Sequence, residues 1–386
     1  MPRTDASILT LAVAASWPGR PPSDLARLDP TDIRRLVKAA ERLGTAPAVV
    51  SNLLDAGHAP ALTAAELGLH DATLFTNLIA LDAAETLLAA FAAEGVRAVP
   101  LKGTAILLDL WPGRPAARAM HDVDLLLDTE DFRAVTANLE ALGWRRDRGT
   151  PLADGLSPEA RFLLDVGPGA QLVELHRTLV FPGRHAIDTR ALFERTHGEG
   201  ARRRLDPADH LVYLAVHKAM HGYLNDARDL IDGAAWIDAG TGEEPPGTPL
   251  RWEAVVERAV EWRARAVTWL FLTRVASSFG VPVPPAVLDA LRPSAARRVA
   301  LQRAMPDITT EPAMQPLKNE ARPLLPKALA ALLANDSPGL ELAVLALIVG
   351  RRLGDHGLAR LRLATAARPW ADRLSLRPLE RVARRR

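Results

Sequence analysis

The sequence predicts a helix-rich α+β fold, with a small mixed-sheet core between helical segments. Alanine and leucine recur at helical spacing through most of the 386 residues, and runs of β-branched residues are few. The exception begins at Val96, where short apolar strands alternate with helical patterns. We therefore expect an N-terminal helical segment at 1–95, an α/β core at 96–200 and a C-terminal helical domain at 201–386.

The N-terminal segment follows from its apolar periodicity. Apolar residues three and four apart occupy 31–43, 46–54 and 64–94, and each pattern predicts an amphipathic helix. Gly95 ends the last of these patterns, because glycine is favoured just past the end of a helix.

Short strands and two helices make up the expected core. Gly167-Pro168-Gly169 predicts a tight connection between the last two strands, which would then form a hairpin. The expected strands are 97–101, 122–127, 161–166 and 171–175, and the expected helices are 103–110 and 130–142.

Helical patterns resume after the core. Asp206-Pro207 is a typical helix start, since proline is favoured in the first turn. It predicts a helix to about residue 223. Further helices are expected at 226–239, 252–279 and 324–374.

Composition excludes several classes of site and partner. The chain has no cysteine, which excludes disulfides, thiolate zinc sites and cysteine nucleophiles. The formal net charge is only +2, from 48 Lys and Arg against 46 Asp and Glu. Proteins dedicated to nucleic acids usually carry a concentrated basic face, so we expect no nucleic-acid partner.

We also expect a cytoplasmic protein with no membrane partner. The segment 1–15 carries Asp5 within its apolar stretch and lacks a basic start, so it does not resemble a signal peptide. The most apolar later stretch, 340–349, is about half the length that spans a bilayer.

The most informative motif is Asp122-Val123-Asp124, at the start of an expected strand. Side chains two apart in a strand project from one face, so the two carboxylates lie side by side while Val123 turns to the core. Two like charges this close repel and need a compensating cation. Mg²⁺ and Mn²⁺ suit carboxylates and are often held by them together with phosphate oxygens. The pair therefore predicts a divalent metal site.

Lys102-Gly103-Thr104 precedes that strand and is typical of a phosphate-binding element. Gly103 lacks a Cβ, so the backbone can approach a phosphate closely. Thr104 adds a hydroxyl, and the free N–H groups of the helix expected there would point at the anion. Lys102 and Arg118 are the candidate cationic partners.

A third carboxylate is expected on a neighbouring strand. Val173 and Leu175 share an apolar face, and Glu174 between them points the other way. With the two aspartates, Glu174 would complete a metal site, either as a ligand of a second metal or as a general base. His176 shares the face of Glu174 and is a candidate to support the metal-binding carboxylates.

Taken together, these residues resemble the DNA polymerase β-like nucleotidyltransferase superfamily, and within it the family of uncharacterised nucleotidyltransferases. The resemblance covers roughly residues 35–240 and departs in three places. Thr104 replaces the commoner serine, Glu174 replaces the usual aspartate, and the gap from Gly103 to Asp122 is longer than in most of the superfamily, though it fits this family. The motifs that carry it are Leu101-Lys102-Gly103, Arg118, Asp122-Val123-Asp124-Leu125-Leu126 and Glu174-Leu175-His176.

The resemblance implies transfer of a nucleoside monophosphate from a nucleoside triphosphate, such as ATP, to a hydroxyl on a small molecule, sugar or peptide. It implies Mg²⁺ or Mn²⁺ as cofactor and release of pyrophosphate. Members of the family frequently lie beside genes for peptide natural products or surface polysaccharides, and the first of these settings suggests a role in natural product biosynthesis. Two alternatives remain open: a kinase-type phosphoryl transfer on the same scaffold, and an inactive scaffold that binds nucleotide or a partner.

The helical arm after the core adds two candidate residues. The helix that starts at Pro207 carries one stripe with Lys218 beside it, and the stripe consists of His210, Leu214, His217 and His221. We expect this face to close over the nucleotide, with Lys218 on the β- or γ-phosphate and Asp229 of the next helix near the ribose or acceptor. The alternative is that Lys218 and Asp229 pair with each other and only join the two helices.

Overall fold

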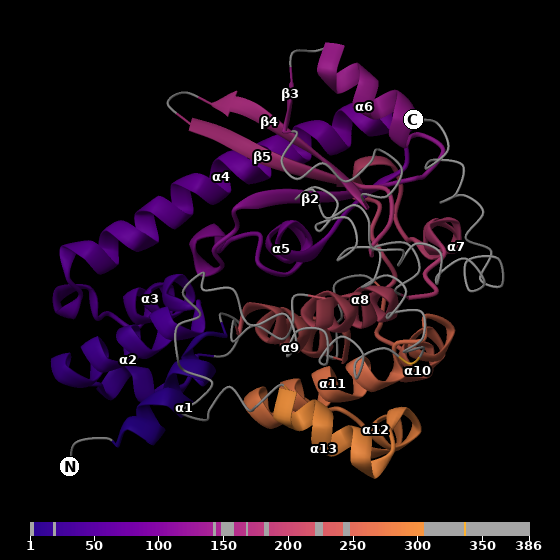
Figure 1. The fold of residues 1–386 in the computed structure, drawn as a ribbon. Helices are drawn as coiled ribbons and strands as arrows, with labels where there is room; N and C mark the ends of the chain where they lie inside the picture. The colour runs from indigo at the N-terminus through magenta and orange to yellow at the C-terminus, as the bar shows by residue number, and fades with distance from the viewer. Residues whose placement is uncertain are drawn as a thin grey trace, which may run out of the picture.

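The computed structural model describes residues 4–17, 21–141, 144–147, 158–166, 169–180, 185–220, 227–241, 248–304 and Asp336. The helices expected between 324 and 374 lie outside this part of the chain except for Asp336, as does the apolar stretch 340–349. In the described part of the chain, helices lie before and after a small mixed sheet, which confirms the α+β class (Figure 1).

Three of the four helices described before the sheet, α1, α2 and α4, begin at a capping side chain. The Asp29 carboxylate accepts a hydrogen bond of 2.8 Å from the backbone N–H of Thr31. Thr63 and Glu66 form a reciprocal capping box at the start of the longest helix. These elements are α1 (Asp5–Ala15), α2 (Pro30–Leu43), α3 (Ala46–Asp55) and α4 (Ala64–Ala93).

In the described residues the strands form one five-stranded sheet with the order β1-β2-β5-β4-β3. β2 and β5 run parallel, and the other neighbouring strands are antiparallel. β4 and β5 form the predicted hairpin, in which Val166 pairs with Gly169. The strands are β1 (Ala98–Pro100), β2 (Asp122–Leu127), β3 (Arg145–Asp147), β4 (Glu159–Val166) and β5 (Gly169–His176).

The helical stretch expected at 103–110 begins one residue earlier and changes its hydrogen-bonding pattern. α5 (Lys102–Ala105) continues into a π-helical turn (Ile106–Leu110). α6 (Phe132–Ala141) follows β2 in the sequence and lies at the β3 edge of the sheet (Figure 1).

The helix expected at 252–279 is two helices. Arg263 between them has a φ of 57°, in the left-handed region, which breaks the helical ladder. The helices after the sheet are α7 (Thr189–Arg195), α8 (Pro207–Met220), α9 (Arg228–Thr241), α10 (Trp252–Glu261), α11 (Arg265–Phe279), α12 (Pro285–Leu291) and α13 (Ala295–Ala304). Short 3₁₀ turns lie at Ser23–Arg27, Ala59–Ala61, Pro115–Ala117 and Gly200–Arg202.

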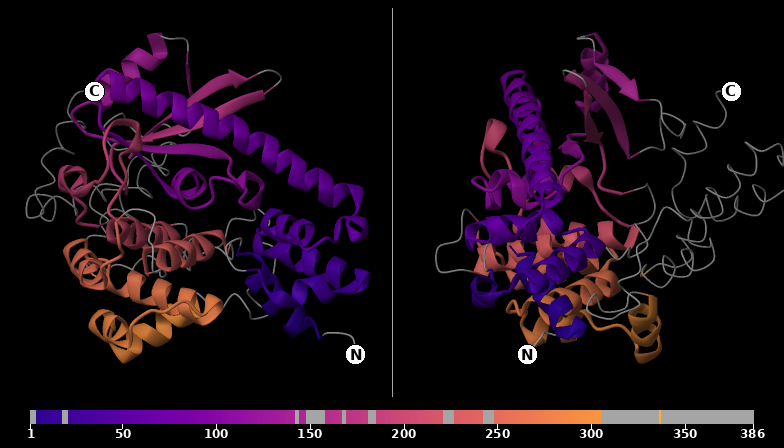
Figure 2. Two further views of the ribbon diagram at one scale, coloured as in Figure 1. Left: turned by 180° about the vertical axis from the view of Figure 1, so that it is seen from behind. Right: turned by 90° about the vertical axis from the view of Figure 1, so that its left-hand side faces the viewer.

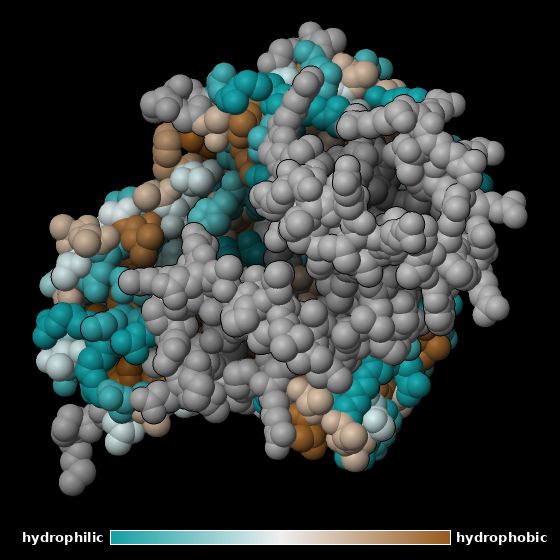
Figure 3. Space-filling view, in the orientation of Figure 1, coloured by the Kyte–Doolittle hydropathy of each residue, from teal (hydrophilic) through white to brown (hydrophobic). Residues whose placement is uncertain are grey.

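One continuous hydrophobic cluster, from Ile8 to Leu301, joins these elements. α4 crosses the back of the sheet and contacts β1 and β2, as the view from behind shows (Figure 2). By length and composition alone α4 could cross a membrane, but such properties are shared by core helices, and its Ala84, Leu88 and Phe91 are buried in this core. The surface seen in Figure 3 mixes hydrophilic and hydrophobic residues over its coloured parts.

Candidate active site

The predicted carboxylates come from the two parallel strands in the middle of the sheet. Asp124 on β2 pairs directly with Glu174 on β5, so both side chains emerge from the same face. Val123, Val173 and Leu175 turn to the other face and are fully buried. His176 follows Glu174 by two residues and shares its face.

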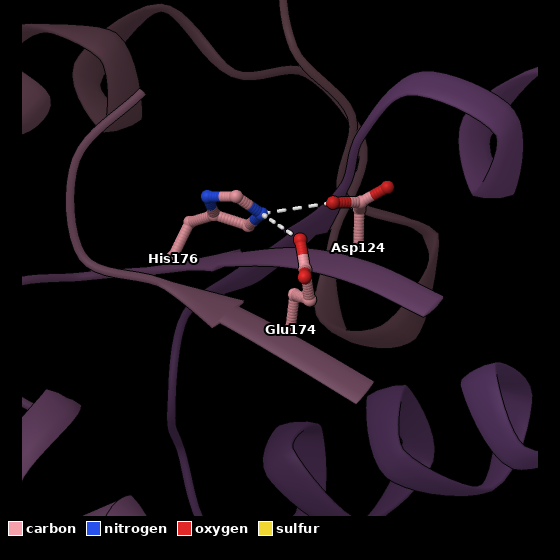
Figure 4. Close-up of side chains that lie close together, drawn as sticks. All are labelled: Asp124, Glu174 and His176. Carbon is pink, nitrogen blue, oxygen red and sulfur yellow. Dashed lines mark hydrogen bonds and ion pairs between the residues drawn. The ribbon is translucent and has the colours of Figure 1, made fainter. Parts of the chain in front are cut away.

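Asp124, Glu174 and His176 converge within this face (Figure 4). The His176 Nε2 atom lies 2.9 Å from Asp124 Oδ1 and 3.8 Å from Glu174 Oε2. One ligand atom from each residue lies within 4.8 Å of the others, so the three could hold one metal ion. Asp122 is not part of this close cluster, but it is half-buried and lines the same cavity.

That cavity has a volume of about 430 Å³, which is in the range of small-molecule sites. α5, β2 and β5 contribute residues to its walls, and so do α8 and α9 of the helical segment after the sheet. Besides the carboxylates it exposes four cationic side chains, which are Lys102, Arg118, Lys218 and Arg228. A cavity with both kinds of charge suits an anionic ligand that brings its own cation.

Lys102 reaches directly into the carboxylate cluster. Its Nζ lies 2.6 Å from Asp124 Oδ1, and its φ of 45° places it in the left-handed region, which is costly for a residue other than glycine. Burial opposes the charge on Lys102, but Tyr213 and Asp124 outweigh it and raise the pKa of Lys102 well above its usual value. Burial also opposes the charge on Asp124, yet Lys102 and His176 hold the pKa of Asp124 well below its usual range. The pair is therefore charged at neutral pH.

The pKa values of Asp122 and Glu174 are shifted upward, in the opposite direction from the pKa of Asp124. Burial, followed by the charge of Asp124, raises the pKa of Asp122. Burial, then Asp124 and Glu159, raises the pKa of Glu174 to about 7. His176 and Lys102 lower the pKa of Glu174 and so offset part of this effect. Glu174 Oε1 also lies 3.2 Å from Arg161 Nε. Asp122 and Glu174 therefore hold a proton more readily than free carboxylic acids do.

Thr104 takes a different place from the one expected. Its side chain is fully buried, and its hydroxyl oxygen accepts a 3.0 Å hydrogen bond from the backbone N–H of Asp124. The Leu101 N–H in turn donates to the Asp124 carbonyl at 3.0 Å. Thr104 therefore fixes the start of α5 against β2 and positions Asp124 from behind, and it does not line the cavity.

Gly103 faces a side chain of the protein, the guanidinium of Arg118. A Cβ at position 103 would lie 2.0 Å from Arg118 Nη1, so only glycine leaves room for this arginine. Arg118 is held by Asp232 of α9, through bonds of 2.9 Å from Nε and 2.8 Å from Nη2. The fork of two hydrogen bonds fixes the guanidinium plane at the cavity wall.

Replacing Gly103 with alanine should therefore destabilise the protein by about 1–3 kcal/mol, the usual cost of inserting a methyl group into a packed site. Gly68→Ala is the matched control, because a Cβ at this position of α4 would meet nothing within 4 Å, and alanine should stabilise that helix by up to about 1 kcal/mol. Urea unfolding of both variants measures the difference. Equal stability of the two variants would show that Arg118 gives way without cost.

Lys218 and Asp229 both line the cavity, and they pair with each other. The Lys218 Nζ lies 3.5 Å from Asp229 Oδ2, and His217 Nδ1 lies 3.6 Å from the other carboxylate oxygen. Burial opposes the charge on Asp229, but Lys218 and then His217 outweigh it, and the pKa of Asp229 is well below its usual range. The ion pair between Lys218 and Asp229 that the sequence left open as an alternative is thus present. Both residues also line the cavity, where a ligand would lie.

The histidine stripe of α8 divides into two environments. His210 and Leu214 are buried in the core, where the His210 ring packs on Trp236 at 4.6 Å between centroids. Only His217 of the described part of the stripe lines the cavity. His221, the last member of the stripe in the sequence, lies outside the described residues.

Several cavity residues were not found from the sequence, and Tyr213 and Glu159 are two of them. Tyr213 on α8 is almost fully buried beside Lys102, and it carries no motif that would have marked it. Glu159 on β4 pairs across the sheet with His176. A signal for Glu159 did exist, because a hairpin with its connection at 167–168 places residue 159 opposite residue 176.

Comparison with known families gives one result. The family model described as uncharacterised nucleotidyltransferase matches residues 29–280, which is well over half of the chain. The matched range contains the whole sheet and every residue of the cavity described above. No curated protein and no solved structure gives a significant match. The chain therefore belongs to the uncharacterised nucleotidyltransferase family.

Proposed function

We propose that the protein transfers a nucleoside monophosphate from a nucleoside triphosphate to a hydroxyl group of an acceptor and releases pyrophosphate. Membership of a nucleotidyltransferase family supports the general reaction. The observation that carries the finer proposal is the cluster of Asp124, Glu174 and His176 at the base of a cavity that also exposes Lys102 and Arg118. Carboxylates for a metal and cations for phosphates are the two requirements of this chemistry.

The donor set fits a divalent cation. Asp122, Asp124 and Glu174 offer carboxylate oxygens. Burial raises the pKa values of Asp122 and Glu174, and repulsion by Asp124, which a cation would relieve, raises them further. These residues would hold Mg²⁺ or Mn²⁺. When bound, the metal would neutralise charge on the triphosphate and help to align it.

The chain's own residues account for the remaining steps. Lys102, Arg118 and Lys218 would bind phosphate oxygens of the triphosphate and balance their charge. The acceptor hydroxyl oxygen forms a bond to the α-phosphorus, and the bond from that phosphorus to the α,β-bridging oxygen breaks, so that pyrophosphate leaves. The hydroxyl proton would pass to a carboxylate of the cluster, and Glu174, with a pKa of about 7, is suited to accept it.

The acceptor and the setting belong to the same proposal. A small molecule, a sugar or a peptide would supply the hydroxyl, in the cytoplasm and as part of natural product biosynthesis. The near-neutral net charge of +2 favours these acceptors over a nucleic acid.

Product analysis tests the reaction. The protein is incubated with each nucleoside triphosphate, Mg²⁺ or Mn²⁺ and a panel of acceptors, and the products are read by mass spectrometry and pyrophosphate release. We expect an acceptor heavier by a nucleoside monophosphate, and no product with Asp124→Asn. Asp71→Asn, on an exposed aspartate of α4, is the matched control and should keep full activity. Release of nucleoside diphosphate would instead indicate a kinase, and neither product across the panel would favour the inactive scaffold.

A comparison of two variants tests the phosphate role of Lys218. Lys218→Met should weaken triphosphate binding at least about tenfold, whereas Asp229→Asn should have a smaller effect, because it leaves the positive charge in place. Isothermal titration with each nucleotide measures the dissociation constants. If Lys218 only joins α8 to α9, both variants will lower stability by similar amounts and neither will weaken nucleotide binding selectively.

A further inference from the structure

We propose that His176 binds the metal directly through Nε2, so that the site is a mixed nitrogen and oxygen centre that prefers a first-row transition ion to Mg²⁺. This inference rests on the metal dependence of the proposed function. It goes further by assigning a nitrogen ligand, and with it a class of metal.

The first support is the distance between donor atoms. Two ligands of one ion, each about 2.1 Å from it, lie roughly 3.0–3.4 Å apart in octahedral or tetrahedral geometry. The His176 Nε2 atom lies 2.9 Å from Asp124 Oδ1 and 3.8 Å from Glu174 Oε2, and these two distances bracket that range. The 2.9 Å contact is a hydrogen bond, which a bound ion would replace. Figure 4 shows the imidazole edge directed between the two carboxylates. His176 is thus placed as a ligand beside the carboxylates and not behind them.

The second support is the other ring nitrogen. Ligation through Nε2 requires the proton on Nδ1, and a metal-binding histidine usually donates that proton to a carboxylate or carbonyl. The Nδ1 atom of His176 is buried and makes no hydrogen bond to the described residues. Glu159 Oε2 lies 3.6 Å away, on the residue paired with His176 across β4 and β5. A small side-chain movement would let Glu159 accept the proton, which makes it the positioning residue for His176.

The third support is the rigidity of the arrangement. His176 is 3% exposed, and it ends the strand that pairs in parallel with β2. Its ring is therefore held in place before any ion arrives. Imidazole is a better ligand for transition ions than for Mg²⁺, which prefers oxygen and keeps several waters. A fixed imidazole in the ligand set consequently favours the transition ion.

Electron spin-echo spectroscopy of the full-length protein with Mn²⁺ alone tests this assignment. We expect modulation from a coordinated imidazole nitrogen, which should change to the ¹⁵N pattern when only the histidines are ¹⁵N-labelled. The modulation should disappear in His176→Gln. It should persist in His121→Gln, the matched control, because His121 lines the same cavity but is not part of the ligand cluster. Glu159→Gln should retain the modulation and bind Mn²⁺ about tenfold more weakly.

Competition gives the second measurement. Displacing half of the bound Mn²⁺ should require at least about tenfold more Mg²⁺ in the parent protein than in His176→Gln. Bound Mn²⁺ without nitrogen modulation in the parent protein overturns the assignment of His176 even if that variant cannot be purified. Modulation that persists in His176→Gln overturns it as well. Absence of any Mn²⁺ binding has a different meaning, since it would overturn the metal dependence of the proposed function together with this inference.

Discussion

Replacing Glu174 with glutamine is expected to lower turnover by about 10²–10⁴-fold, the range for loss of a general base. Glutamine keeps the shape of the side chain but neither carries the charge that binds a metal nor accepts a proton. Because Lys102 and Arg118 remain in place, the variant should retain much of the affinity for nucleotide. Steady-state kinetics combined with nucleotide titration separates the two effects.

The same substitution should change how stability depends on pH in the metal-free protein. The pKa of Glu174 is raised from 4.5 to about 7, so the folded state binds more protons than the unfolded state between these values. The free energy of unfolding therefore falls as pH rises through this window, by about 3 kcal/mol at most at 1.36 kcal/mol per pKa unit. Glutamine cannot ionise, so Glu174→Gln should be the more stable protein above pH 7. Urea unfolding between pH 5 and 8 measures this.

Glu85→Gln is the matched control for both effects, because Glu85 is an exposed glutamate on α4. It should leave turnover and the pH dependence of stability unchanged. Near-normal turnover of Glu174→Gln would make Glu174 a structural residue. An unchanged stability profile would show that burial and the neighbouring carboxylates do not raise the pKa of Glu174.

Joint replacement of Asp122 and Asp124 with asparagine is expected to abolish the stabilisation that triphosphate and metal give to the fold. A ligand present at one hundred times its dissociation constant raises the free energy of unfolding by about 2.7 kcal/mol. The double variant removes two oxygen-donor carboxylates from one strand, so metal and triphosphate should no longer act together. Thermal unfolding with and without Mn²⁺ and each nucleotide measures the change.

The protein without ligands serves as the reference for this experiment. Asp124 is buried against Lys102, so its replacement alone should cost some stability. Asp122→Asn, at a half-buried position, should fold normally and lose most of the metal-dependent shift. If the single and the double variant both show a ligand-induced thermal shift as large as that of the parent protein, the metal and nucleotide bind elsewhere.

Local patterns in the sequence determined many of the helices, the central strands and the carboxylate motif, although they did not show the break at Arg263 between α10 and α11. Strand alternation is a property of the backbone itself. It therefore placed Asp122 and Asp124 on one face of their strand, and Glu174 on the face that Val173 and Leu175 do not share, without knowledge of the fold. Cap and stop residues had the same local origin, as the capping box at Thr63 shows. The α+β class was predictable for this reason.

Tertiary structure alone decided which of these side chains meet. The register between β2 and β5 brings His176 onto Asp124, and packing of α9 against the core supplies Asp232 to Arg118. Thr104, expected to face a phosphate, instead holds the backbone of Asp124. Such contacts join residues far apart in the chain, and their geometry depends on how whole elements pack, which no local periodicity records.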